Sequence, residues 1–144
     1  MLLDGDDAFL GRQVMALFNA VYQKNRAAVV YSRYFVVSNN DRGGIGGSSR
    51  EIPHELLEKD KFRAARGFFT SHLLTFYADL FWKIKPADLK YDNKTFFKFA
   101  YDVALITPII EMVGTRIKFI EETTYEYRFD TGINDPGWGQ IEVD

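Results

Sequence analysis

The stretch at positions 28–37 limits most strongly the folds open to this chain. It is dense in β-branched and aromatic residues, among them Val29, Val30, Tyr31 and Tyr34. Such residues favour a β-strand, and here they occupy both sets of alternating positions, so both faces of the strand are apolar. A strand of this kind belongs in a sheet that is covered on both sides. We therefore expect an α/β protein with a mixed sheet flanked by helices.

Length and composition predict one domain. The chain has 144 residues, of which 47% are hydrophobic and 16% aromatic, enough for a single domain with a core. We expect this domain to span residues 1–144. Glycine, serine and asparagine dominate residues 38–50, which we expect to form a flexible loop, and residues 129–144 are expected to form a loop-like tail.

The charge and cysteine content exclude several classes of function. A net charge of −2 gives no basis for nucleic-acid binding. The chain has no cysteine, which rules out disulfides and thiolate metal ligands. No apolar run approaches the roughly 20 residues needed to cross a bilayer, and Asp4 interrupts any signal-peptide pattern at the N-terminus. We therefore expect a soluble cytoplasmic protein.

Hydrophobic periodicity predicts the remaining elements. A helical period and an apolar face predict four helices, and Pro108 is expected to kink or end the last of them before Gly114 closes it. Apolar runs and alternation predict a buried strand end and a final strand, or a strand pair bent around Glu121 and Glu122. The expected helices are residues 9–25, 53–66, 77–84 and 103–113, and the expected strands beyond the first are residues 68–76 and 117–128.

Three carboxylates around a glycine follow two apolar residues at the N-terminus. In an extended segment Asp4 and Asp6 would point to the same side and could share one cation. Hard oxygen ligands of this kind suit Mg²⁺ or Mn²⁺, with water and substrate phosphates completing the shell. The same residues are also good chemistry for a turn followed by a helix N-cap, with Asp6 or Asp7 as the capping residue.

Two further residues each have a structural and a functional interpretation. His72 lies within an apolar run, where a histidine is usually a core residue bonded to backbone. Asp102 opens the helix at 103–113, which makes it either an N-cap or a carboxylate held among aromatics at a helix mouth. In the second case, desolvation could raise its pKa towards the range of a general base.

The order of these segments resembles the second half of a family-2 glycosyltransferase with the GT-A fold. The acidic motif of that family, which follows a buried strand, resembles residues 2–7, and its acceptor-side strand and helix resemble residues 70–76 and 80–84. Its catalytic-base motif resembles residues 101–105. Its closing helix and strand resemble residues 108–114, 118–120 and 125–128.

This resemblance implies a partial GT-A fold and an inverting sugar transfer from a nucleotide-diphosphate donor to a glycan or other hydroxyl acceptor. It implies a Mn²⁺ or Mg²⁺ ion held by Asp4 and Asp6, and Asp102 as the base that deprotonates the acceptor. It also implies that His72 hydrogen-bonds a substrate hydroxyl, and that Asp7 orients its neighbours in the substrate site or caps the helix.

The sequence also departs from the family pattern. Relatives carry a nucleotide-binding half of roughly a hundred residues before the acidic motif, whereas this chain begins three residues before Asp4. Many relatives supply a late histidine as a metal ligand, and Pro136 stands in the matching region here. The alternative is therefore a non-catalytic relative that works as an interaction or assembly module, either as an oligomer or with a missing N-terminal half.

Overall fold

The structure is a computed structural model of the whole chain. It describes residues 1, 3–38, 41–47, 49–58, 61–65, 68–92, 94–97 and 100–129. The expected tail at 129–144 therefore lies outside the described residues, apart from Phe129.

A mixed sheet forms the centre of the fold. Its strands run in the order β1 (Ala8–Phe9), β5 (Ile117–Arg128), β2 (Val29–Ser38) and β3 (Asp41–Ile45), and β4 (Leu74–Phe76) also pairs with β2. The long central pair, β2 and β5, is parallel, whereas the other pairs are antiparallel. The expected α/β class with a mixed sheet is confirmed.

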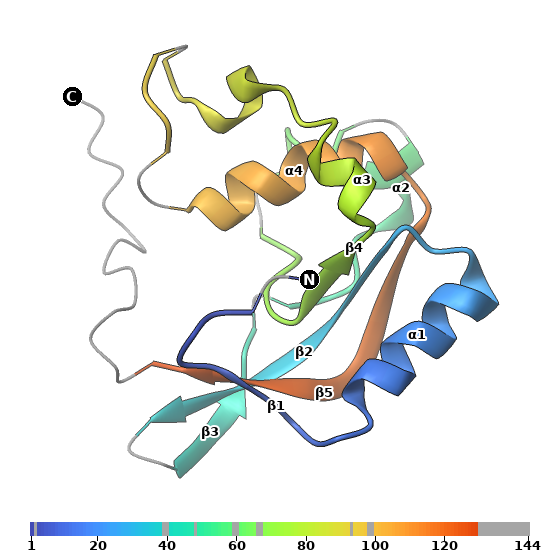
Figure 1. Cartoon of the computed structure of the whole chain (residues 1–144), viewed down its shortest axis with the longest axis vertical. Helices are drawn as coiled ribbons and strands as arrows, with labels where there is room; N and C mark the ends of the chain where they lie inside the picture. The colour runs from blue at the N-terminus through green and yellow to red at the C-terminus, as the bar shows by residue number, and fades with distance from the viewer. Residues whose placement is uncertain are drawn as a thin grey trace.

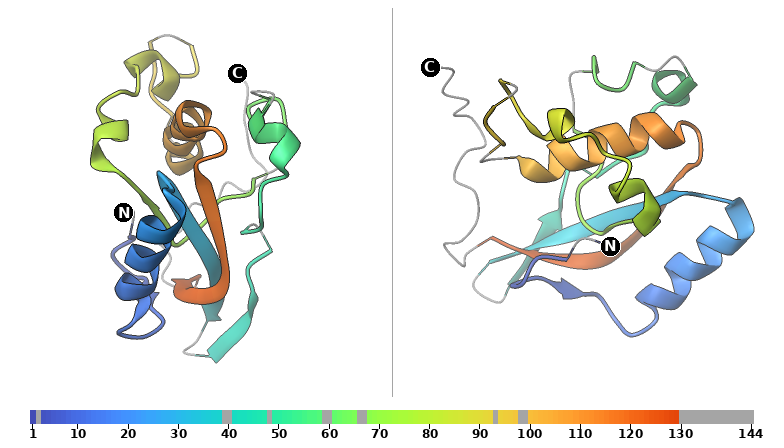
Figure 2. Two further views of the ribbon diagram at one scale, coloured as in Figure 1. Left: turned by 90° about the vertical axis from the view of Figure 1, so that its right-hand side faces the viewer. Right: turned by 45° about the horizontal axis from the view of Figure 1, so that its top comes forward.

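Alternate residues of β2 enter two separate hydrophobic cores, as the apolar character of both strand faces predicts. Val30 and Tyr34 pack with residues of α1 (Val14–Asn25). Val29 and Tyr31 pack with residues of α4 (Tyr101–Val113). The two views in Figure 2 show α1 and α4 on different sides of the sheet.

Short elements connect the long ones. The helices α2 (His54–Glu58) and α3 (Ala78–Phe81) and the 3₁₀ helix η1 (Pro86–Leu89) lie around α4, above the sheet in Figure 1. These helices are shorter than the amphipathic patterns at 53–66 and 77–84 predict. None of the helices in the described part of the chain has the length and apolar character needed to span a membrane.

The expected glycine-rich loop instead contains the strand β3, which forms a hairpin with β2. Gly46 explains why this segment needs glycines. Its amide donates a hydrogen bond to the carbonyl of Tyr34 at 2.9 Å, and a Cβ at this position would lie 1.9 Å from the Tyr34 ring. Close packing on β2 thus explains Gly46, whereas Gly44 and Gly47 have open space around them. The loop prediction is wrong for residues 41–45.

Two boundaries differ from the sequence expectations for local reasons. The segment predicted as a helix from residue 9 first gives Phe9 to β1, and α1 begins at Val14. Hydrophobic periodicity cannot separate a two-residue strand from the helix that follows it. The strand at 117–128 is one strand, β5, whose register against β2 shifts near Arg33, so the strand-pair alternative is wrong.

The helix α4 closes at Gly114, as predicted, but it runs through Pro108, so the expectation that Pro108 would end it is wrong. Proline removes one backbone donor and usually interrupts a helix, yet Pro108 is buried inside this one. The N-cap of α4 is Ala100, which has a left-handed backbone conformation. Asp102 therefore lies in the first turn, and its interpretation as the N-cap is wrong.

Candidate functional site

The N-terminal acidic segment forms a turn. The amide of Asp7 donates a hydrogen bond to the carbonyl of Asp4 at 3.3 Å. The turn that the second interpretation of these residues predicts is therefore confirmed, and the extended segment that the pairing of Asp4 with Asp6 requires is not found. Neither Asp6 nor Asp7 caps a helix, because the N-cap of α1 is Gln13. A turn of this kind brings residue i close to residue i+3. The carboxylate that lies near Asp4 in a shared group is that of Asp7.

Strand β5 holds Asp7 in place through both carboxylate oxygens. The Tyr125 hydroxyl donates to Oδ2 at 2.7 Å, and the backbone amide of Arg128 donates to Oδ1 at 2.7 Å. The same tyrosine oxygen accepts a hydrogen bond from the amide of Asp4 at 3.3 Å. Pairing of β1 with β5, in which Phe9 lies opposite Tyr125, brings these groups together. Asp7 and Tyr125 thus fix the shape of the turn that presents Asp4.

Burial dominates the electrostatics of this contact. It raises the pKa of Asp7, although the hydrogen bonds from Arg128 and Tyr125 act in the opposite direction. Burial also raises the pKa of Tyr125, and the neighbouring Asp7 carboxylate adds to the effect. The phenol is therefore a stable hydrogen-bond donor at neutral pH.

His72 reaches the same place from the loop before β4. Its ring stacks on Tyr125 at 5.3 Å between centroids and on Tyr127 at 5.4 Å, with interplanar angles of 18° and 8°. Its Nε2 lies 3.8 Å from Oδ2 of Asp4. The side chain of His72 is 17% exposed, so aromatic stacking orients a ring that still reaches solvent.

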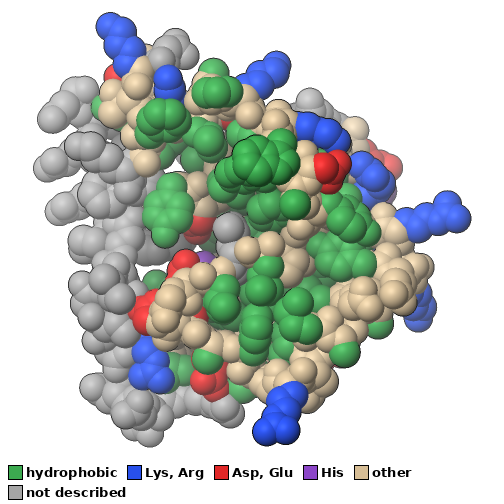
Figure 3. Space-filling model, viewed as in Figure 1, with side chains coloured by type: hydrophobic (Ala, Val, Ile, Leu, Met, Phe, Trp, Pro, Cys, Tyr) green, Lys and Arg blue, Asp and Glu red, His purple; other side chains and the backbone are tan. Residues whose placement is uncertain are grey.

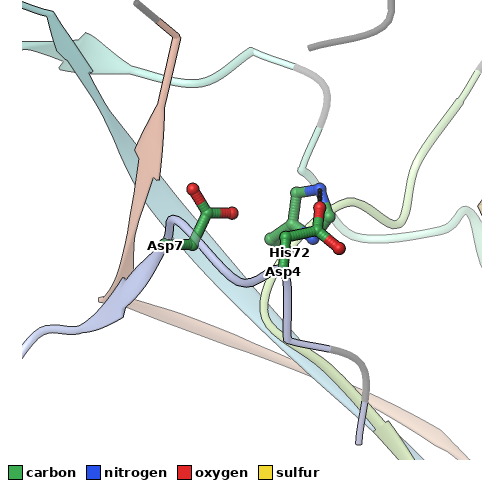
Figure 4. Close-up of side chains that lie close together, drawn as sticks. All are labelled: Asp4, Asp7 and His72. Atoms are coloured by element: carbon green, nitrogen blue, oxygen red, sulfur yellow. Dashed lines mark ion pairs between the residues drawn. The ribbon is translucent and has the colours of Figure 1, made fainter. Parts of the chain in front are cut away.

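Asp4, Asp7 and His72 thus form one group, shown in Figure 4. One ligand atom from each lies within 4.8 Å of the other two. Two carboxylates and an imidazole are a donor set that Mn²⁺ or Mg²⁺ accepts, and Asp4 is the most exposed of the three. The residues therefore fit a divalent cation. Asp6, which the sequence pattern pairs with Asp4, is not a member of this group.

Asp102 lies half-buried in the first turn of α4. At helical spacing it shares a face with Ile106, Ile109 and Val113, all buried in the core between α4 and the sheet. This face directs Asp102 towards the body of the molecule.

The start of α4 and the N-terminal segment lie on the same side of the molecule in Figures 1 and 2. Figure 3 shows a hollow on this face of the molecule, with a histidine visible in it and acidic side chains beside it. The two acidic regions that the sequence singles out are therefore not on opposite sides of the protein.

The sequence analysis missed the tyrosines that support this site. Alternation along residues 117–128 places Tyr125 and Tyr127 on one face of their strand, which is the signal that could have indicated a shared role. Nothing in the local pattern shows that this face would meet the N-terminal turn. Comparison of the chain with protein-family models and with curated proteins gave no match.

Proposed function

We propose that this chain is the acceptor-side part of a metal-assisted glycosyltransferase with a GT-A type of fold. It would transfer a sugar from a nucleotide-diphosphate donor to an acceptor hydroxyl with inversion. The observation that carries the proposal is the group of Asp4, Asp7 and His72, which lies on the same side of the molecule as the start of α4, where Asp102 is found.

The N-terminal turn supplies the donor side. Asp4 and His72 would hold a divalent cation, and Asp7, tied to β5 by two hydrogen bonds, would keep the turn in position. These residues would hold a Mn²⁺ or Mg²⁺ ion, which would supply positive charge to neutralise the leaving diphosphate. Asp6, next to this group in the sequence, remains a predicted ligand that a small movement of the turn could recruit.

The start of α4 supplies the acceptor side. Asp102 would accept the proton of the acceptor hydroxyl as its oxygen attacks the anomeric carbon. The leaving diphosphate departs from the opposite face of that carbon, which inverts its configuration. His72, whose ring the two tyrosines hold, would also hydrogen-bond a substrate hydroxyl.

Isothermal titration with Mn²⁺, alone and with UDP or GDP, tests the donor side. We expect binding in the wild type, a loss of about tenfold or more in Asp4→Ala and in His72→Ala, and unchanged binding in Asp102→Asn. The variant Glu122→Ala changes an exposed carboxylate on β5 and is the control. Equal heats in Asp4→Ala and wild type would refute the metal site.

One observation favours a second candidate, an assembly module. Strand β3 lies at an edge of the sheet, and its last residue, Ile45, is 53% exposed. An exposed edge strand can pair with another chain. Light scattering separates the two candidates, since an assembly module predicts oligomers that Ile45→Lys disrupts, whereas the enzyme predicts no effect of this substitution on Mn²⁺ binding.

A further inference from the structure

Large hydrophobic side chains that face solvent gather between positions 77 and 101. Seven of the thirteen such side chains found among the described residues come from this range, so the clustering is local and not a general property of the surface. Trp82, which follows α3, is 81% exposed. The seven are Tyr77, Phe81, Trp82, Tyr91, Phe96, Phe97 and Tyr101.

These side chains follow one segment of the chain that packs on α4. The segment runs from α3 through η1 to the start of α4, and both α3 and η1 pack on α4. Rings contact each other along it, with centroids 5.2 Å apart for Phe81 and Trp82 and 6.1 Å apart for Tyr91 and Phe97. In Figure 3 hydrophobic side chains cover this part of the visible face, and lysine or arginine side chains project along its upper edge.

Lysines accompany the aromatic residues. Positions 77–101 contain five lysines and three aspartates, whereas the whole chain has a net charge of −2. Each of the three aspartates has a partner within the protein. Asp79 pairs with Lys83 at 3.0 Å, Asp88 lies 3.8 Å from Arg63, and Asp92 accepts the amides of Lys94 and Thr95. Among the described residues of this segment, lysines exceed aspartates by one, and Lys85 and Lys94 are exposed.

The chemistry of this surface distinguishes a membrane from a protein partner. Lysine is depleted in the centre of protein interfaces, but here Lys90 lies over the Phe96 ring at 4.9 Å, and Lys85 and Lys94 are exposed. Tryptophan and tyrosine favour the boundary between lipid and water, and lysine stems cover apolar surface while their ammonium groups reach anionic headgroups.

We propose that this aromatic–lysine surface, made of the seven aromatic side chains and Lys83, Lys85, Lys90 and Lys94, docks on an anionic lipid membrane. The rings enter the headgroup region, and the lysines bind the phosphate and carboxylate groups of the lipids. No spanning helix is involved. Because Tyr101 and Asp102 are neighbours at the start of α4, docking would bring the hollow close to the membrane surface. The inference does not depend on the proposed enzymatic function.

Vesicle co-sedimentation tests the proposal with phosphatidylcholine alone and with added phosphatidylserine. We expect binding only to the vesicles that contain phosphatidylserine, weakened by salt. The double variants Trp82→Ser with Phe96→Ser and Lys85→Ser with Lys94→Ser should each weaken it about tenfold or more. The matched control, Phe129→Ser with Lys24→Ser, removes an exposed ring and an exposed lysine elsewhere and should bind as the wild type does.

Tryptophan fluorescence gives a second readout. The chain has two tryptophans, so Trp138→Phe leaves Trp82 as the single emitter. Its emission should shift to shorter wavelength when phosphatidylserine vesicles are added. Absence of binding, or equal binding by the surface variants and the control, would overturn the proposal. So would light scattering that shows dimers dissociated by Trp82→Ser, since the surface would then join two copies of the chain.

Discussion

The acidic residues Asp7 and Asp102 are held in place by different kinds of contact. Asp7 accepts hydrogen bonds from Tyr125 and from the backbone of Arg128, residues more than a hundred positions away. Asp102 lies in the first turn of α4, where the cap residue Ala100 makes no side-chain hydrogen bond. Long-range contacts therefore shape the proposed donor side, whereas local helix geometry presents the proposed acceptor side.

This difference has a consequence for mutations. Changes around Asp7 should affect folding and the metal site together, because the same contacts support both. Changes at Asp102 should affect the reaction alone. Variants of Asp7 and Asp102 therefore separate an effect on folding from an effect on the reaction.

The largest effect is expected from Asp102→Asn. Loss of a general base lowers the rate of transfer by about 10²–10⁴-fold, while the free energy of unfolding should stay within about 0.5 kcal/mol of the wild type. The measurement is release of nucleoside diphosphate from a panel of UDP- and GDP-sugars, with Glu122→Gln as the control. A variant that loses stability along with activity would show that Asp102 is structural.

The next effect is expected from Asp7→Ala, which leaves the Tyr125 hydroxyl and the Arg128 amide without their acceptor. We expect a loss of about 2 kcal/mol in the free energy of unfolding, measured by urea denaturation. Asp102→Ala, the matched change on the other side of the hollow, should cost less than about 0.5 kcal/mol. Equal losses in the two variants would remove the contrast between the two sides.

A smaller effect is expected from Tyr125→Phe. The ring remains in the core and on His72, but Asp7 loses one donor and the amide of Asp4 loses its acceptor. We expect a cost of about 1–2 kcal/mol and weaker Mn²⁺ binding. Tyr127→Phe, which also keeps a ring stacked on His72, is the control and should bind Mn²⁺ as the wild type does.

The smallest effect concerns pH. Because burial raises the pKa of Asp7, the folded protein holds this proton more tightly than the unfolded chain does. The stability that this group contributes is fully present below its ordinary pKa of 3.8. It is lost as the pH rises through the pKa of Asp7 in the folded protein. Asp7→Asn should therefore gain stability relative to the wild type between that acid pH and neutrality. A difference that is constant with pH would contradict the assignment.

The contrast between the two sides also explains what the sequence could predict. The position of Asp102 at the start of a helix follows from local signals, namely the apolar period after it and Gly114 at the end. The two covered faces of β2 likewise follow from residues within one strand.

Local sequence signals of this kind do not predict contacts between distant segments of the chain. Local residues predict a turn as one of two alternatives around Asp4, but the hydrogen bond from Tyr125 to Asp7, which joins opposite ends of the chain, has no local signal. The same reason explains why His72 was assigned no aromatic partners. The strand β3 was not predicted because a glycine-rich composition indicates a flexible loop. One of these glycines, Gly46, instead makes room for the Tyr34 ring.

The most direct test of the central claim measures whether the two sides face one hollow. The chain has no cysteine, so Asp102→Cys provides a single site for a nitroxide label, and Lys24→Cys provides a control at the end of α1. The proposal predicts that Mn²⁺ broadens the electron paramagnetic resonance signal of the label at position 102, that Asp4→Asn abolishes this broadening, and that the label at position 24 is unaffected. Equal broadening of both labels, or none at position 102 while Mn²⁺ is bound, would contradict it.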